Sequence, residues 1–574
     1  MKERVISLIV YTAFSFLIAA LFFNQIVRFG YYSRLSKNNS IRVIPIDGPR
    51  GNIYDRNGTP LVSNTLCFDV SLVYQELKNR ESLARTLKDA LGMSGTDVLR
   101  ALQKARSKPY VPVKIAEDVG KEKALILEEA SFDTGGIIIE TRSRREYLLK
   151  DKGCHVFGYL TEVTEEELDD LKDYGYRTKD LVGRSGVEKY YNNYLAGSDG
   201  GTQIEVDSRG RQTRVLGLKE PSCGRDLYLT IDADIQAACD SLLGERRGAV
   251  VVLDPNTGEV LALASHPAFD PNVFVKPNMS RSRTVLLNDR RGRPLSNRAI
   301  SSAYPPGSVF KIVVASAALE SKKVSPLTSY NCTGLYSLGK ARFACWKESG
   351  HAAQNVSEAL MNSCNVFFYN AGRAAGVDYI ETSAKMFGFG RETGIDLPDE
   401  VKGIVPGKAW KEKYRKDVWY EGDTVNYSIG QGYLLVTPIQ VAVMTAVEAN
   451  GGYLIKPFLV KRADSDIFPH TPAKKVGLKE NTIKEVRRGM YRVINDENGT
   501  GKRAKVEGVA SAGKTGTAQN PQGRTHAWFT GFAPFDKPKI CLTVFLEHGG
   551  KGGLEPSEIA SGIFEAAKRK GYFN

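Results

Sequence analysis

Three short motifs follow one another along this chain of 574 residues, and they restrict its fold more than any other feature. They are Ser308-Val-Phe-Lys311 after a Tyr-Pro-Pro-Gly turn, Ser363-Cys-Asn365, and Lys514-Thr-Gly-Thr517. Each motif alone occurs by chance in many chains of this size, where an ordinary capped helix or a solvated strand explains it better. All three in this order are the pattern of a site in which a serine becomes acylated.

The first motif predicts a nucleophile at the start of a buried helix. Two prolines and a glycine before Ser308 break the preceding structure, and an apolar run follows. In a helix, Ser308 and Lys311 lie one turn apart on one face, so the lysine can reach the serine hydroxyl. Burial and a second cation, Lys514, would lower the pKa of Lys311 and let it accept the serine proton. The Ser308 amide would then point a donor at the substrate carbonyl oxygen.

The third motif predicts the edge strand of an antiparallel sheet. Two strand-like segments, 527–529 and 540–546, follow it. An extended peptide can pair with such an edge, and a glycine there leaves room for its close approach. We expect the Thr517 N–H to complete an oxyanion hole, and the lysine and threonines of the motif to bind a substrate carboxylate or fix the ammonium network. The predicted substrate-binding residues are Thr515, Gly516 and Thr517.

The second motif and one histidine complete the candidate site. Ser363 and Asn365 suit a proton relay and a contact with a substrate amide. His526 precedes a strand, where a histidine is more often packed for structural reasons, and we keep it only as a candidate substrate-site residue. The predicted catalytic residues are Ser308, Lys311, Ser363, Asn365 and Lys514.

At these positions the chain resembles the class B penicillin-binding proteins. Further segments that look like family signatures lie at 49–58, 183–188, 297–299, 430–432 and 437–440. The resemblance implies a peptidoglycan D,D-transpeptidase, which cleaves the D-Ala–D-Ala bond of one stem peptide and passes the acyl group to an amine of a neighbouring stem. It also implies that penicillins acylate the same serine and that the chemistry requires no cofactor.

Other functions remain as alternatives. A D,D-carboxypeptidase or a serine β-lactamase would pass the acyl group to water, but the sequence shows no convincing water-activating carboxylate after the second motif. A catalytically idle scaffold would not need three intact motifs. Within the family, elongation-type and division-type members both stay open; the segment 526–529 and a Cys/His cluster favour the elongation type.

The cluster consists of Cys332, Cys345, His351 and Cys364, which follow the first motif in sequence; Cys364 is the middle residue of the second motif. Three thiols and one imidazole would form a closed tetrahedral zinc site. The cluster resembles the metal-binding position of elongation-type members, in which ligand types vary. A disulfide between Cys332 and Cys345, or reduced buried cysteines, are the alternatives.

Residues 5–23 form an uncharged apolar run that is long enough to cross a bilayer once. Lys2 and Arg4 precede it, and no suitable cleavage site follows. The sequence predicts an uncleaved, single-pass signal anchor in the bacterial inner membrane, with the catalytic domain outside the cytoplasm. A cleaved signal peptide is the alternative. The expected partners are peptidoglycan stem peptides, β-lactams, a membrane glycosyltransferase and other wall-synthesis proteins.

The net charge of +14 is spread along the chain except for one dense basic stretch. This stretch lacks interleaved aromatic residues and any nucleic-acid-binding motif, so we interpret it as a solvated loop beside an anionic envelope and expect no nucleic-acid partner. Its members are Arg281, Arg283, Arg290, Arg291, Arg293 and Arg298.

Composition and pattern predict three parts. Residues 1–28 are a cytoplasmic tip and transmembrane anchor. Residues 29–225 mix short strands and helices without a catalytic constellation, and resemble the elongated pedestal (dimerisation-type) domain of the family. Residues 226–574 predict an α/β (α+β) transpeptidase domain, an antiparallel sheet sandwiched by helices, with one helical stretch around 357–374.

Overall fold

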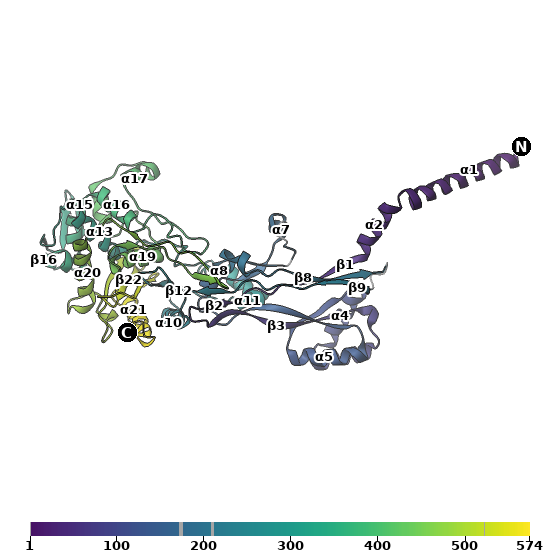
Figure 1. Cartoon of the computed structure of the whole chain (residues 1–574). Coiled ribbons are helices and arrows are strands. Elements are labelled where there is room, and N and C mark those ends of the chain that lie inside the picture. The colour runs from purple at the N-terminus through teal and green to yellow at the C-terminus, as the bar shows by residue number, and fades with distance from the viewer. Residues whose placement is uncertain (1, 172–175, 179, 208–211, 522, 574) are drawn as a thin grey trace. The chain divides into compact units, whose positions relative to one another are not determined.

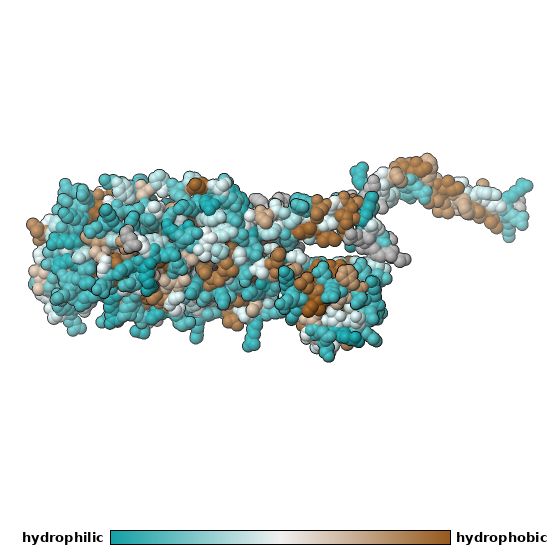
Figure 2. Space-filling view, turned by 60° about the horizontal axis from the view of Figure 1, so that its bottom comes forward, coloured by the Kyte–Doolittle hydropathy of each residue, from teal (hydrophilic) through white to brown (hydrophobic). Residues whose placement is uncertain are grey.

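The computed structural model describes residues 2–171, 176–178, 180–207, 212–521 and 523–573 (Figure 1). Helix α1 (Lys2–Phe22) opens the chain, and a π-helical turn (Phe23–Val27) and α2 (Phe29–Ser40) follow it. The stretch Lys2–Val27 is long and apolar enough to cross a membrane, and the protein buries none of it. Figure 2 shows its apolar side chains on the surface. A lipid environment would cover these side chains.

The chain forms two compact units. The first unit consists of Met1–Arg50, Asn64–Arg144 and Ala196–Gly224, and the second of Gly51–Ser63, Arg145–Leu195 and Arg225–Asn574. Inside the second unit, Arg145 Nε lies 2.7 Å from Glu188 Oε1, and Arg145 Nη1 donates to Gly51 O at 2.6 Å. Both side chains of this ion pair are fully buried, so its hydrogen bonds fix three distant segments in one arrangement.

Besides α1 and α2, the described part of the first unit contains a three-stranded sheet, strands of a second, seven-stranded sheet, and three further α-helices. Strands β1 (Ile41–Ile46), β8 (Gly200–Val206) and β9 (Gln212–Lys219) form an antiparallel sheet in that order. Strand β3 (Pro60–Leu72) pairs with β4 (Val113–Val119) and β5 (Ile137–Tyr147). Helices α3 (Arg80–Leu91), α4 (Gly95–Arg106) and α5 (Lys121–Thr134) share a core with the strands that includes Val70, Leu83, Leu87 and Leu127.

A five-stranded antiparallel sheet forms the centre of the second unit. Its order is β12 (Val260–His266), β11 (Gly248–Leu253), β23 (Ile540–Leu546), β22 (His526–Ala533) and β21 (Ala512–Ala518). Side chains alternate between the two faces: Val250 and Val252 pack in one core, and Val251 and Leu253 in the other. The predicted edge position of the Lys514 strand is therefore confirmed.

Helices cover both faces of this sheet, as the sequence predicts. Helices α10 (Ala233–Leu243) and α21 (Glu555–Arg569) contribute to one core, and α13 (Lys311–Glu320) and α19 (Pro438–Ala449) to the other. The expectation for 357–374 was wrong in one respect. The structure has two helices there, α14 (Val356–Met361) and α15 (Asn365–Ala375), separated at Ser363.

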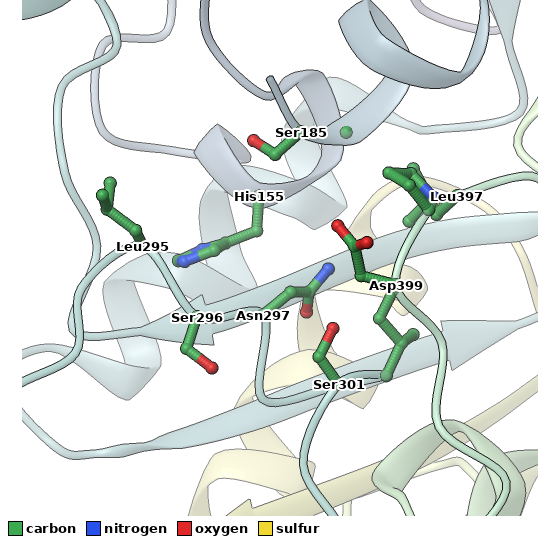
Figure 3. Close-up of a pocket in the computed structure, with 11 residues that line it drawn as sticks. His155, Ser185, Leu295, Ser296, Asn297, Ser301, Leu397 and Asp399 are labelled. Carbon is green, nitrogen blue, oxygen red and sulfur yellow. The ribbon is translucent and has the colours of Figure 1, made fainter. Parts of the chain in front are cut away.

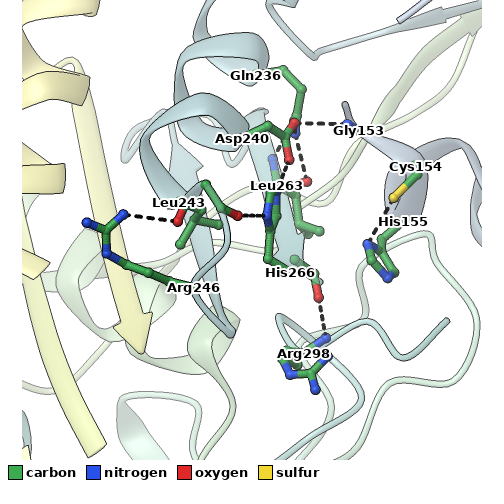
Figure 4. Close-up of polar contacts among 12 residues, drawn as sticks. Gly153, Cys154, His155, Gln236, Asp240, Leu243, Arg246, Leu263, His266 and Arg298 are labelled. Carbon is green, nitrogen blue, oxygen red and sulfur yellow. Dashed lines mark hydrogen bonds and ion pairs between the residues drawn. The ribbon is translucent and has the colours of Figure 1, made fainter. Parts of the chain in front are cut away.

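A buried polar network ties α10 to β12 (Figure 4). His266 Nε2 lies 2.9 Å from Asp240 Oδ1, and His266 Nδ1 lies 2.7 Å from Gly244 O. The other carboxylate oxygen of Asp240 accepts from Gln236 Nε2 and from Gly153 N. Burial opposes protonation of His266, but the carboxylate outweighs it and raises the pKa of the imidazole. A protonated His266 ring donates to both acceptors. Because Asp240 also accepts from Gly153 N, the network holds segment 145–195 against the sheet of the same unit.

Candidate active site

Ser308 lies in a tight turn that packs against the backbone at Gly430 and at Thr517. The turn is a 3-10 helix (Gly307–Phe310) directly before α13, not the start of an α-helix as the sequence predicts. Gly307 has φ +55°, its N–H donates to Gly430 O at 3.0 Å, and a Cβ on it would lie 2.5 Å from Thr517 O. Ser308 itself is half-buried. In a 3-10 helix residues i and i+3 eclipse, so Ser308 and Lys311 still share one face.

Ser363 occupies the break between α14 and α15 in a strained conformation. Its φ of +50° is left-handed, which costs a residue with a side chain roughly 1–2 kcal/mol. The indole nitrogen of Trp346 donates to Ser363 O at 3.1 Å, and Lys311 Nζ donates to the same carbonyl at 2.9 Å. These two bonds offset the strain and turn the Ser363 hydroxyl toward the lysines.

Two buried lysines converge on that hydroxyl. Lys311 Nζ lies 3.4 Å and Lys514 Nζ 3.0 Å from Ser363 Oγ, and Lys311 Nζ also donates to Asn365 Oδ1 at 2.6 Å. Both lysine side chains are fully buried, and in the described part of the chain neither forms an ion pair with a carboxylate. The four predicted residues Lys311, Ser363, Asn365 and Lys514 thus meet at one place.

Burial controls the protonation of both amines. It lowers the pKa of Lys311 to about 8. It also lowers the pKa of Lys514 well below its ordinary value, and the charge of Lys311 adds to this effect. The sequence assigned Lys514 as the cation that tunes Lys311; in the structure the charge of Lys311 contributes to the lowered pKa of Lys514. A neutral amine in this pair can accept a proton, and the Ser363 hydroxyl can relay it.

The edge strand β21 passes beside the Ser308 turn. A Cβ on Gly516 would lie 3.0 Å from Pro306 O and from Val309 Cγ1, so any larger residue would have to push the Ser308 turn away by a few tenths of an ångström. Thr517 is exposed, and Thr515 Oγ1 bonds Thr500 Oγ1 at 3.0 Å. A substrate strand paired with this edge would therefore run next to Ser308.

The Cys/His cluster lies directly behind the second motif. The ligand atoms of Cys332, Cys345, His351 and Cys364 are all within 4.8 Å of one another. His351 Nδ1 is 3.6 Å from the sulfurs of both Cys332 and Cys345, while its buried Nε2 lacks a hydrogen-bond partner among the described residues. Ligands of tetrahedral zinc lie roughly 3.7 Å apart, so the donor set fits the metal. All three cysteines are free thiols, and the alternative disulfide is not formed.

Two residues of the site were missed from the sequence. Trp346 follows a cluster cysteine, and although its ring is mostly exposed, its indole N–H donates to both Asn362 O at 2.9 Å and Ser363 O at 3.1 Å. Thr500 links Thr515 to the carbonyl of Met361 on α14; no sequence signal identifies it.

His526 is buried, its Nδ1 accepts from His548 N, and its ring contacts Tyr304, which is the packed role a strand histidine usually has.

Comparison with known proteins gives the family. A model described as the penicillin binding protein transpeptidase domain matches residues 248–565, and one described as the penicillin-binding protein dimerisation domain matches residues 45–229. The chain belongs to the penicillin-binding protein family. It is 35% identical over 568 residues to peptidoglycan D,D-transpeptidase MrdA of Acinetobacter baumannii, and the match covers 94% of this chain and 83% of that protein. MrdA of Escherichia coli K12 is 34% identical over 566 residues, 93% and 89% of the two chains.

Solved structures of penicillin-binding proteins agree with this assignment. PBP2 of Helicobacter pylori in complex with MreC has a TM-score of 0.80 and 30% identity, and the match covers 93% of this chain and 99% of that one. A chain of a peptidoglycan synthase complex that coordinates polymerization and crosslinking has a TM-score of 0.77 and 30% identity, and covers 99% and 98%.

The contact between Gly307 and Thr517 gives a test of the nucleophile turn. Gly307→Ala should destabilise the second unit by more than the ~1 kcal/mol of a left-handed alanine alone, because the new Cβ must also displace the Thr517 backbone. Gly339→Ala is the matched control, since Gly339 has φ +57° and nothing within 4 Å of its Cβ position. Urea unfolding of the detergent-solubilised variants measures both; equal losses would contradict the close contact.

Proposed function

We propose that the chain is an elongation-type peptidoglycan D,D-transpeptidase that cross-links stem peptides through an acyl-enzyme on Ser308. The convergence of two buried lysines on one serine hydroxyl, beside the Ser308 turn, carries this proposal. Similarity to MrdA and to PBP2 supports the elongation type over the division type. Nothing in the site favours water over an amine as the acceptor.

In the first half-reaction, neutral Lys311 accepts the proton of Ser308 as Oγ attacks the carbonyl carbon of the D-Ala–D-Ala bond. The proton passes through the Ser363 hydroxyl to the nitrogen of the terminal D-Ala, and the C–N bond breaks. An amine of a neighbouring stem then attacks the ester carbon and gives a proton to Lys311. The new amide bond forms, the ester C–O bond breaks, and Lys311 returns the proton to Ser308 Oγ. Within the lysine pair, both amines already lie within hydrogen-bond reach of the Ser363 hydroxyl that relays the proton.

The edge strand supplies the substrate contacts in this proposal. The N–H groups of Ser308 and Thr517 would stabilise the oxyanion, and the donor peptide would pair with β21 along Thr515 and Gly516. Lys514 and the two threonine hydroxyls would bind its terminal carboxylate. β-Lactams would acylate the same serine from the same groove.

The remaining parts of the chain take roles that fit this reaction. Residues 1–28 would anchor the chain in the inner membrane with the rest of the chain outside the cytoplasm, 29–225 would act as the pedestal, and 226–574 would carry out catalysis. A membrane glycosyltransferase and a scaffold like the MreC that binds H. pylori PBP2 would be its partners. The chemistry itself uses no cofactor.

We also propose that Cys332, Cys345, His351 and Cys364 hold one structural zinc ion. Cys364 lies between Ser363 and Asn365, so the metal would fix the strained break at which both side chains meet Lys311. Zinc would supply rigidity there and take no part in acyl transfer.

The first test is the identity of the acylated residue. A fluorescent penicillin should label the protein at Ser308, and Ser308→Ala should abolish labelling because no other nucleophile occupies that turn. Ser337→Ala, a change of the same size on an exposed hairpin, should leave labelling intact. Peptide mass mapping identifies the labelled residue. Labelling that survives in Ser308→Ala would disprove the mechanism.

The second test concerns the base. The neutral form of Lys311 increases as pH rises through its pKa of about 8, so the rate of penicillin acylation at saturation should increase over that range and then level off. Lys311→Ala should lower this rate about 10²- to 10⁴-fold and remove the pH step. Stopped-flow measurement of acylation gives the profile. A profile in wild-type protein that falls with pH would rule out a lysine base.

The third test concerns the metal. Protein purified under reducing conditions without chelator should contain one zinc per chain, and His351→Ala should lose it and acquire a lower melting temperature. Cys223→Ser, at an exposed cysteine outside the cluster, should keep the zinc. Elemental analysis and differential scanning calorimetry supply the measurements. Metal-free wild-type protein would contradict the site.

A further inference from the structure

The proposed reaction does not use the basic stretch that the sequence contains. Between residues 276 and 297 there are six cationic side chains and one acidic side chain, Asp289. Helix α12 (Ser280–Asn288) and the loop after it carry them on the surface. Within the described ranges, none of Arg281, Arg290, Arg291 and Arg293 takes part in an ion pair, although many other surface arginines of the second unit do.

The loop that presents these arginines is rigid. Arg298 is buried, pairs with Glu547 at 2.9 Å, and donates to Gly292 O at 2.8 Å and Arg293 O at 3.2 Å. Asp289 Oδ1 accepts from Gly292 N at 2.7 Å, which closes the turn from the other side. The backbone positions of Arg290 and Arg293 are therefore fixed before a ligand arrives, so binding does not have to order the loop, and only the arginine side chains lose rotamer freedom.

Two adjoining cavities lie beside the loop. The larger, about 390 Å³, is lined by Arg290 and Arg293 together with Leu286, Leu287 and Leu295, and by Asp289, whose Oδ1 already accepts from Gly292 N. The smaller, about 210 Å³, shares Leu295 and Ser296 with it. The shared residues join the cavities into one groove with a cationic, apolar end and a polar end.

The polar end contains groups suited to a peptide main chain. Asn297, Ser301 and Asp399 direct their polar atoms toward a common space, and Ser185 lies on the opposite side of it (Figure 3). His155 forms part of the wall, and its Nε2 lies 2.7 Å from Pro294 O, which holds the loop to this end of the groove. Hydroxyl, amide and carboxylate groups can bind backbone N–H and C=O groups that a lipid does not have.

We propose that this groove binds an extended acidic segment of a partner protein. Carboxylates of the segment pair with Arg290 and Arg293, its apolar side chains pack on Leu286 and Leu287, and its main chain bonds the polar end. Leu287 is 61% exposed, and a partner would cover this surface. Charge complementarity favours an acidic partner, because no carboxylate of the described chain neutralises these arginines.

The test uses a fluorescein-labelled peptide of alternating glutamate and leucine with the full-length protein in detergent. Fluorescence anisotropy should show saturable binding that weakens with salt, and a peptide with glutamine in place of glutamate should not bind. Arg290→Glu combined with Arg293→Glu should weaken binding about tenfold or more. Penicillin labelling of Ser308 should be unchanged, which shows that the variant is folded and separates this result from the proposed function.

The matched control is Arg281→Glu combined with Arg291→Glu. It changes the net charge by the same amount at exposed positions that do not line the cavities, and it should leave peptide binding within about twofold of the wild type. Equal weakening by both double variants would show unspecific attraction and overturn the groove. Binding to vesicles of anionic phospholipid, without binding to the peptide, would overturn it in favour of a membrane surface.

Discussion

The burial of two lysines around one serine hydroxyl is the constraint on which the site depends. Lys311 and Lys514 both bond Ser363 Oγ, and neither has a carboxylate partner within the described chain. Two ammonium charges about 6 Å apart repel by roughly 3 kcal/mol at an effective dielectric constant of about 20, and each also loses its hydration. The protein avoids this cost if one amine is neutral. The repulsion and lost hydration that would destabilise a doubly charged pair therefore favour one neutral amine, and a neutral amine is the base that an acylating serine needs.

The geometry of Ser363 explains how the pair is maintained. Its left-handed conformation ends α14, starts α15 and turns the hydroxyl between the two amines. Trp346 and Lys311 bind its carbonyl, and the Cys/His cluster surrounds the next residue, Cys364. A strain of roughly 1–2 kcal/mol is small beside several buried hydrogen bonds. Local strain and the indole contact thus act on Ser363, and the Cys/His cluster includes its neighbour Cys364, so all three meet at the break between α14 and α15.

The sheet and the set of active-site residues could be predicted from the sequence more fully than the local geometry of the site. The apolar, strand-like segments that follow the third motif, together with its glycine, were sufficient to place β21 at an edge beside the nucleophile, because these signals are local. The break at Ser363 could not be predicted, since the residues around it are compatible with a continuous helix and the break depends on bonds to Lys311 and Trp346. The grouping of Gly51–Ser63 with the C-terminal unit likewise depends on long-range contacts.

Three glycines let the separate parts of the site meet at the distance the chemistry requires. An added Cβ would meet backbone at each of these glycines. At Gly307 it would meet Thr517 O, at Gly430 it would meet Gly307 O, and at Gly516 it would meet Pro306 O. Any side chain at these positions would separate the nucleophile turn from the substrate edge, and an error of about 1 Å in such a site can cost about 10²-fold in rate. The lysine pair sets the protonation state, but backbone contact at the glycines sets the position of Ser308 relative to a bound strand. Reactivity and placement are therefore encoded by different residues, and the first and third motifs each combine a chemical group with a glycine that gives it room.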